Sequence, residues 1–280
     1  MFSRLAGAIL RAILVALLIA TPSLLLPSSS PETTQIVTLI ALFSAALVIF
    51  EYASVYPSLI EFRDAPPFNR VRFMSLFVTV FLLSVISRGQ IEPTNLTQFV
   101  QAVGGLIGYA IDFPYSPVRL VLQMFPTDTS VDNIFMVRTA AGLAYLISLI
   151  TLTIFIIILR LQGWPVQGRS FNVWVNLPTF DPTAGGDVVV RLIRDARLNI
   201  ILGFVLPFLT PVVVSSASTL FTPVTVGSPQ TLIWTVSAWA FLPASLFMRG
   251  IAMHRIAEMI REQRRQAYEL AALEQGFAPS

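Results

Sequence analysis

The sequence contains no lysine and no cysteine, and its only histidine is His254, so all eighteen basic side chains are arginines. Without lysine, the chain cannot form a phosphate-binding loop of the GxxxxGK type or a Schiff base. Without cysteine, it cannot form a thiolate metal site, an iron–sulfur cluster or a disulfide. These absences exclude nucleotide motors of the GxxxxGK class and retinal proteins.

Charged residues of either sign are also scarce. They make up 12% of the chain, whereas a soluble domain carries roughly 25%. Hydrophobic residues make up 55%, and the mean hydropathy is +0.76. The charges bracket long apolar runs, as expected when each run crosses about 30 Å of hydrocarbon. The composition therefore predicts an all-α integral membrane protein.

The apolar runs predict about six transmembrane helices in a single polytopic domain covering residues 1–280. The N-terminal run could instead begin a cleaved signal peptide, but no clear cleavage site follows it, so a retained first span is the better interpretation. Between Leu198 and Met248 no residue is charged, and the Pro and Gly of FTPVTVGSPQ indicate a hairpin of two spans. The predicted spans lie near 10–28, 34–56, 72–88, 138–160, 199–220 and 231–249.

The arginines predict the orientation, because cytoplasmic connections of membrane proteins collect positive residues. With the N-terminus inside, only Arg88, Arg119 and Arg138 lie outside, which leaves fifteen of the eighteen arginines on cytoplasmic segments. The exclusive use of arginine is typical of GC-rich bacterial genomes. We therefore expect a multi-pass protein of a bacterial inner membrane with both termini in the cytoplasm.

The outer connection after the third span is longer than a turn. We expect short interfacial helices there, and the sequence leaves open whether residues 98–125 dip into the membrane. Ser116 is placed to cap a helix that begins at Pro117. Gly104 and Gly108 are helix-packing candidates because a small-xxx-small pair permits close approach, although they could merely fit a turn.

The cytoplasmic loop 161–198 contains two predicted elements. Alternation of Phe171, Val173 and Val175 indicates a strand or extended segment. Asp187 is placed to cap a helix that runs on into the fifth span. Arginines near the membrane surface on this helix are candidates for contacting anionic lipid or a partner, although they could be ordinary topology determinants. These are Arg191, Arg194 and Arg197.

The C-terminal segment 250–276 is a long amphipathic cytoplasmic helix by pattern, and it continues the sixth span until Gly276. One side is apolar, and a half-apolar helix is stabilised by packing on a partner. That partner could be the protein's own inner loop, a copy of itself or another membrane protein. The lipid- or partner-contacting candidates are Met253, Ile256, Ile260, Arg261, Arg264 and Arg265.

The sequence pattern brings no set of catalytic or metal-ligating side chains together. His254, Glu258 and Glu262 share a helix face, but a solvated face paired with arginines is favoured over a metal site. No predicted span carries a charge near its centre. Arg11 and Glu51 lie toward span ends, where snorkelling to the headgroups would relieve them. We therefore expect no catalytic residue, no cofactor, no metal and no nucleic-acid partner.

Two functions remain in competition on these grounds. The leading hypothesis is a non-catalytic inner-membrane subunit, scaffold or assembly factor that contacts partners through its cytoplasmic loop and C-terminal helix. The alternative is a channel or facilitator-type transporter for a small solute, because proline-containing spans and half-inserted segments are where transporters bind cargo.

Overall fold

The computed structural model describes residues 2–27, 30–165, 172–181, 183, 185–218 and 228–274. All regular structure in these residues is helical, and six helices are long and apolar enough to cross a membrane: α1, α2, α3, α6, α8 and α9. The protein is therefore an all-α, multi-pass membrane protein, as predicted. The helices are α1 (Phe2–Leu25), α2 (Pro31–Ala53), α3 (Phe68–Gly89), α4 (Asn95–Ile111), α5 (Pro117–Leu122), α6 (Val131–Leu161), α7 (Val173–Asn176), α8 (Val188–Ser218) and α9 (Pro229–Glu274).

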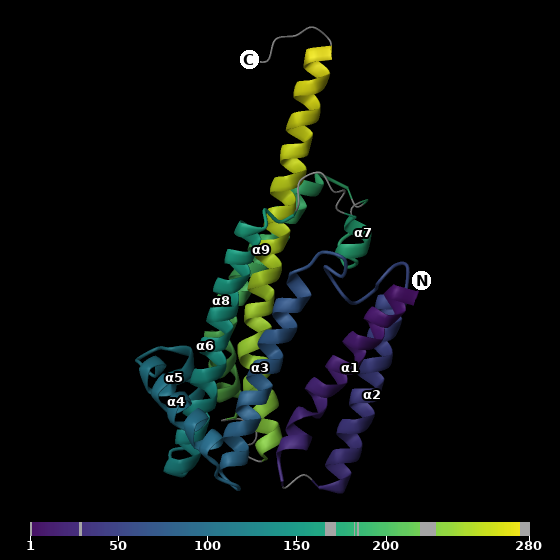
Figure 1. Cartoon of the computed structure of the whole chain (residues 1–280). Coiled ribbons are helices and arrows are strands. Elements are labelled where there is room, and N and C mark those ends of the chain that lie inside the picture. The colour runs from purple at the N-terminus through teal and green to yellow at the C-terminus, as the bar shows by residue number, and fades with distance from the viewer. Residues whose placement is uncertain are drawn as a thin grey trace.

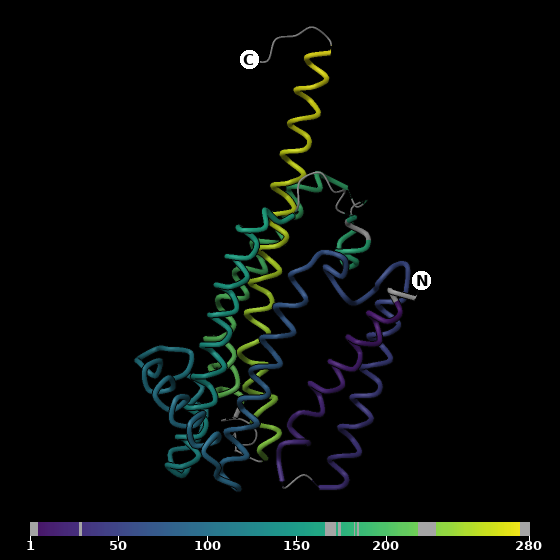
Figure 2. The backbone as a smooth tube through the Cα atoms, in the orientation of Figure 1, coloured from purple at the N-terminus to yellow at the C-terminus, as the bar shows by residue number. Residues whose placement is uncertain are grey.

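The six long helices form two hairpins with α3 between them, and α6 packs against α3 and α9 (Figure 1). α8 and α9 pack side by side along most of the length of α8, while α1 and α2 form the second hairpin. α3 and α6 pack against α9 and against each other. The backbone trace shows α1 and α2 leaning away from α3 toward one end (Figure 2).

The start of α1 and the end of α9 lie at the same end of the bundle (Figure 1). The connections from α2 to α3 and from α6 to α8 lie there too, and we call this the arginine-rich end. α4 and α5, from the longest connection, pack beside α6 at the opposite end. Because the number of long helices is even, the start of α1 and the end of α9 lie at the same end of the bundle.

The buried apolar residues form two clusters. One lies within the bundle and joins α3, α4, α5, α6 and α9 through residues such as Leu83, Val137 and Ile233. The other lies at the arginine-rich end, where Phe62, Trp164 and other residues of the connections pack against α6, α8 and α9. The described parts of the connections at this end therefore belong to a folded layer.

Glycines set the closest helix approaches. Gly108 of α4 lies against α6, and a β-carbon added to Gly142 would stand 2.5 Å from the Cα of Gly108. A β-carbon on Gly104 would stand 2.9 Å from Cγ2 of Thr139, also on α6. Gly203 of α8 faces the backbone of α9 in the same way, at 2.7 Å from the nitrogen of Phe247. A side chain at Gly108, Gly142 or Gly203 would therefore push two backbones apart, whereas one at Gly104 would meet the Thr139 side chain.

Helix caps follow the predictions at two positions. Ser116 accepts a hydrogen bond from the backbone N–H of Arg119, and α5 begins at Pro117. Asp187 accepts from the N–H of Val189 at 2.6 Å, immediately before α8. Both side chains satisfy N–H groups that a helix start leaves without intrahelical partners.

The predicted strand near residues 171–175 is wrong. Val173–Asn176 form the short helix α7, and Phe171 lies outside the described residues. Asn176 is buried, and its backbone and side-chain oxygens accept from the N–H groups of Phe62 and Asp64. An alternation of three residues is too short to separate an extended strand from one helical turn that is covered on one side.

Candidate functional site

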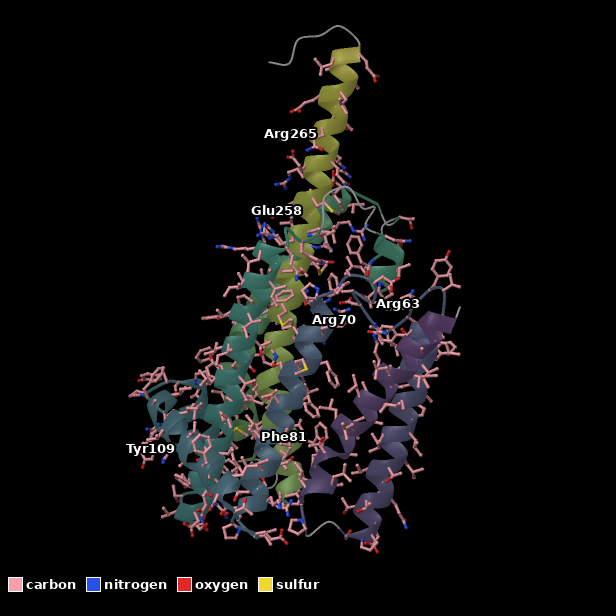
Figure 3. The ribbon with its side chains drawn as sticks, in the orientation of Figure 1. Arg63, Arg70, Phe81, Tyr109, Glu258 and Arg265 are labelled. Carbon is pink, nitrogen blue, oxygen red and sulfur yellow. The ribbon has the colours of Figure 1, made fainter. Side chains whose placement is uncertain are left out.

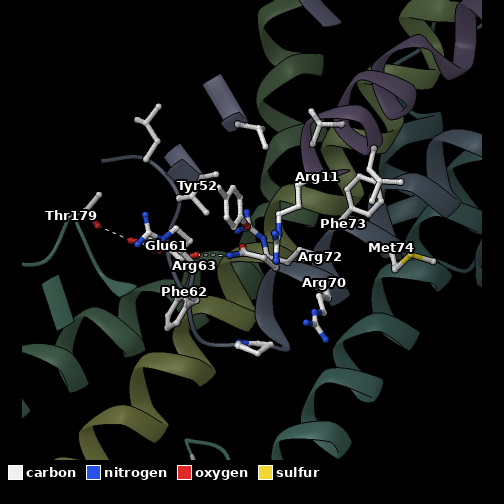
Figure 4. A pocket seen from close by; sticks show the side chains of 17 residues that line it. Arg11, Tyr52, Glu61, Phe62, Arg63, Arg70, Arg72, Phe73, Met74 and Thr179 are labelled. Atoms are coloured by element: carbon white, nitrogen blue, oxygen red, sulfur yellow. Dashed lines mark hydrogen bonds between the residues drawn. The ribbon is translucent and has the colours of Figure 1, made fainter. Parts of the chain in front are cut away.

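A cavity of about 820 Å³ opens at the arginine-rich end, between the α1–α2 hairpin and the start of α3 (Figure 4). We call it the arginine pocket. Four arginines and one glutamate contribute to its lining, and apolar side chains from α1, α2 and α3 form the remaining wall. Its charged residues are Arg11, Glu61, Arg63, Arg70 and Arg72.

Arg11 and Arg72 approach each other from different helices, beside the ring of Tyr52 (Figure 4). The Arg11 guanidinium lies 4.5 Å from the Tyr52 ring centroid and donates to the carbonyl of Gly7. The Arg72 guanidinium lies 5.1 Å from the Phe68 ring, and its Nε is buried with no hydrogen-bond partner among the described residues. Aromatic faces therefore hold both cations without neutralising them.

The one carboxylate in the lining already has partners. Glu61 accepts two hydrogen bonds from Arg249 of α9, at 2.6 and 2.8 Å, and a third from Thr179. Its backbone carbonyl accepts from Asn69. Glu61 therefore joins three segments at the rim of the pocket, and its charge is largely used by Arg249.

The expectation that Glu51 snorkels to the headgroups is wrong, because its carboxylate is buried and bound by the protein. It is 3% exposed, and its carboxylate accepts from the N–H groups of Ser58, Leu59 and Ile60 and from the Ser58 hydroxyl. The chain folds back after α2 to supply these donors. Arg63 completes the turn by donating to the carbonyls of Glu51, Ser54 and Val55. Glu51 and Arg63 thus shape the wall of the pocket.

Within the described residues, Arg11, Arg70 and Arg72 form no ion pair. Because four arginines face one glutamate among the lining residues, the pocket combines an excess of positive charge with an apolar wall. An anionic group attached to an apolar body matches both features. The sequence singled out none of these three arginines as a site, because they come from segments that only the tertiary fold brings together.

The C-terminal half of α9 divides into two parts. Met253 and Ile256 are fully buried in the protein's own folded layer, and Ile260 packs partly against the same cluster. From Arg261 onward the helix leaves the buried layer, and beyond the ion pair of Arg264 with Asp187 it projects past the other helices (Figures 1 and 3). Most side chains of residues 261–274 are exposed, among them Tyr268 at 75%, Leu270 at 62% and Leu273 at 56%.

The basic residues predicted to contact lipid or a partner lie around the base of this projection. Arg264 forms an ion pair with Asp187 at 2.7 Å, and Arg265 pairs with Glu262. Arg191 donates to the carbonyl of Asp181 and lies over the Phe180 ring. Arg194, beside Asp195, is exposed, and so are Arg197 and Arg261.

His254 and Glu258 approach each other to 3.4 Å, and Arg255 shares the same carboxylate. In the described part of the chain, no three His, Cys, Asp or Glu side chains are grouped so that they could hold a metal ion.

A second ionic cluster lies at the opposite end. Asp112, which follows α4, pairs with Arg119 of α5 at 2.6 Å and with Arg138 of α6 at 2.9 Å. The Asp112 side chain is 4% exposed, and Arg138 also lies over the ring of Tyr109, which Figure 3 labels at this end. This cluster ties α4 and α5 to α6.

The fold and these sites define a multi-pass helical membrane protein with an arginine-lined pocket and a projecting helix at one end. The chain matches no protein-family model, no curated protein and no solved structure. Proposals about its function therefore depend on its own geometry.

Proposed function

We propose that the protein is a non-catalytic subunit, scaffold or assembly factor of a complex in a bacterial inner membrane. It holds a partner through the projecting part of α9, residues 261–274, together with the adjoining connection from α6 to α8. The single observation that carries this proposal is the exposed apolar surface on a helix that extends beyond the folded layer.

The length of α9 supports this proposal. Its 46 residues span about 69 Å as helix, more than twice the 30 Å or so of membrane hydrocarbon. The first part beyond the bundle is fixed by burial of Met253, Ile256 and Ala257. The projection therefore starts from a rigid base and needs no separate nucleation. Exposed Leu and Tyr on such a helix are typical of surfaces that pack on another helix.

The distribution of arginines supports a cytoplasmic projection. Arg88, Arg119 and Arg138 belong to the opposite end, while every other arginine with a described side chain belongs to the arginine-rich end. Positive residues favour the cytoplasmic side of the membrane. Both termini and the projecting helix are then cytoplasmic.

A truncation after Gln266 tests the partner directly. It leaves the buried residues of α9 and the Arg264–Asp187 ion pair in place, whereas deletion from residue 251 would also remove the core residues Met253 and Ile256. Affinity purification in mild detergent should recover a partner, or a second copy by mass, with the full chain and lose it with the truncated chain.

A point variant sharpens the test. The double substitution Leu270→Glu, Leu273→Glu makes the exposed apolar surface charged and should abolish the same association. Glu274→Gln, a polar exchange on the same turns, is the matched control and should preserve it. Recovery of the same polypeptides with all four proteins, or a full chain that stays alone, would contradict the proposal.

The alternative, a channel or facilitator for a small solute, has weaker support. A cavity of about 300 Å³ lies between α5, α8 and α9, beside the helix-internal prolines Pro207, Pro211 and Pro243. Its wall is apolar except for Thr210, Thr235 and Trp239, and Trp239 Nε1 donates to the carbonyl of Pro207. Such a wall offers a polar solute few hydrogen bonds. Solute flux in proteoliposomes would nevertheless favour this alternative.

A further inference from the structure

We propose that the arginine pocket binds one anionic phospholipid. The lipid phosphate accepts hydrogen bonds from Arg11 and Arg72, with Arg70 nearby, and an acyl chain lies along the apolar wall. Arg63 takes no part in this contact, because it already donates to three backbone carbonyls.

The positions of the arginines along their helices match the depth of lipid headgroups. Arg70 and Arg72 lie in the first turns of α3, whose 22 residues cover about 33 Å and must cross about 30 Å of hydrocarbon. The start of α3 therefore lies at the membrane surface. Arg11, although further along α1, reaches the same place because α1 packs beside α3 and its side chain extends to Tyr52.

Arg72 lines the pocket and forms no ion pair among the described residues, and its buried Nε has no hydrogen-bond acceptor there. An anion in the pocket would balance the charge of this guanidinium and accept hydrogen bonds from those of its N–H groups that face the cavity. The two aromatic rings near its guanidinium, Phe68 and Phe241, contribute a cation–π contact but no lone pair. A phosphate oxygen has the charge and the lone pairs that this site lacks.

The apolar wall distinguishes a lipid from a free inorganic anion. Leu14, Val15, Val48, Phe73 and Met74 line the pocket beside the arginines. Leu14 and Met74 remain 37% and 55% exposed. Inorganic phosphate would leave this wall uncovered, whereas an acyl chain would cover it. The combination of wall and charge therefore favours an amphipathic anion delivered from the bilayer.

The experiment is a titration of the purified full-length protein followed by native mass spectrometry, with dioctanoyl phosphatidylglycerol as the probe. We expect one saturable lipid for each chain, and at least tenfold weaker binding of dioctanoyl phosphatidylcholine. Arg11→Gln and Arg72→Gln should each weaken phosphatidylglycerol binding about fivefold, the usual effect of one arginine at an anionic surface.

Arg194→Gln is the matched control. Arg194 belongs to the same end of the molecule, but its side chain is 75% exposed and lies beside Asp195, outside the pocket. Its loss should leave the single saturable site unchanged. If Arg194→Gln weakens binding as much as the pocket variants, or if both lipids bind equally, the pocket is not a specific site and the proposal is wrong.

Two further arms separate a lipid from a free anion and protect the test against misfolding. Val15→Trp fills the apolar wall and should weaken phosphatidylglycerol binding while leaving the arginines in place. If inorganic phosphate competes at the same concentration as phosphatidylglycerol and Val15→Trp has no effect, the ligand is a free anion and the lipid assignment fails. If Arg72→Gln is not monodisperse, the effects of Arg11→Gln and Arg70→Gln on phosphatidylglycerol binding test the proposal in its place, because both of these side chains are exposed.

Discussion

Two pairs of arginines, one at each end of the helical bundle, are placed in opposite ways. At the end that holds α4 and α5, Arg119 and Arg138 converge on one buried carboxylate, Asp112. At the arginine-rich end, Arg11 and Arg72 converge on a pocket in which Glu61, the one carboxylate among the described lining residues, is already bound by Arg249. The comparison teaches that a guanidinium beside its carboxylate holds helices together, whereas one left beside a cavity is available to an external anion.

Asp112→Asn should produce the largest loss of stability. It leaves Arg138, whose side chain is only 19% exposed, without its carboxylate. Removing one partner of a buried ion pair typically costs about 3 kcal/mol or more, because the other charge stays buried. We expect the free energy of unfolding, measured by denaturant titration in mixed micelles, to fall by about 3 kcal/mol.

Asp132→Asn provides the control for this prediction. Asp132 lies in the first turn of α6 at the same end, but it is exposed. Its substitution should have a much smaller effect. Equal losses for the two variants would show that Asp112 contributes no more than a surface charge and would remove the contrast between the ends.

Arg72→Met should change the stability of the lipid-free protein little and should reduce its stabilisation by lipid. Without lipid, the substitution has two effects that offset each other. It removes a partly buried cation with an unsatisfied Nε, which is stabilising, and it removes the contacts of that cation with Phe68 and Phe241, which is destabilising. The unfolding free energy should therefore change by less than about 1 kcal/mol. Added dioctanoyl phosphatidylglycerol should raise the melting temperature of the wild type, because a ligand stabilises the state that binds it, and should raise that of the variant much less.

A lipid-free loss comparable to that of Asp112→Asn would show that Arg72 is structural. The two ends would then use arginine in the same way, and the arginine pocket would lose its main support.

The sequence predicted the membrane architecture because that information is local. Each long apolar run forms its own helix, and the caps at Ser116 and Asp187 are set by neighbours in the chain. The continuation of the sixth span into a cytoplasmic helix is local as well, since the helix-forming pattern resumes directly after Gly250 and α9 continues through it. Every one of these features can be recognised within a window of a few turns.

The arginine pocket could not be predicted from one sequence. Arg11 and Arg72 are brought together only because the α1–α2 hairpin packs beside α3, and no local pattern specifies that packing. The prediction for Glu51 was wrong for a related reason. Its position near a helix end indicated snorkelling, but the chain after α2 folds back and donates three backbone N–H groups to its carboxylate.

The smallest effect is expected at an exposed ion pair, Asp187 with Arg264, which joins the base of the projecting helix to the start of α8. The hydrogen bond from Arg264, with a backbone N–H from Val189, lowers the pKa of Asp187 below its usual value. A lowered folded-state pKa contributes stability above the unfolded value of about 3.9, and this contribution is lost as the pH falls through the folded value. Asp187→Asn retains a helix cap but loses the charge, so its melting temperature should lie slightly below the wild type at pH 7, and the difference should vanish in acid.

Asp195→Asn, whose partner Arg194 is its neighbour on the same helix, should show no such difference at either pH, because exposed pairs of adjacent residues contribute little. A difference for Asp187→Asn that persists at pH 2 would mean that cap geometry, and not the ion pair with Arg264, fixes the base of the projection.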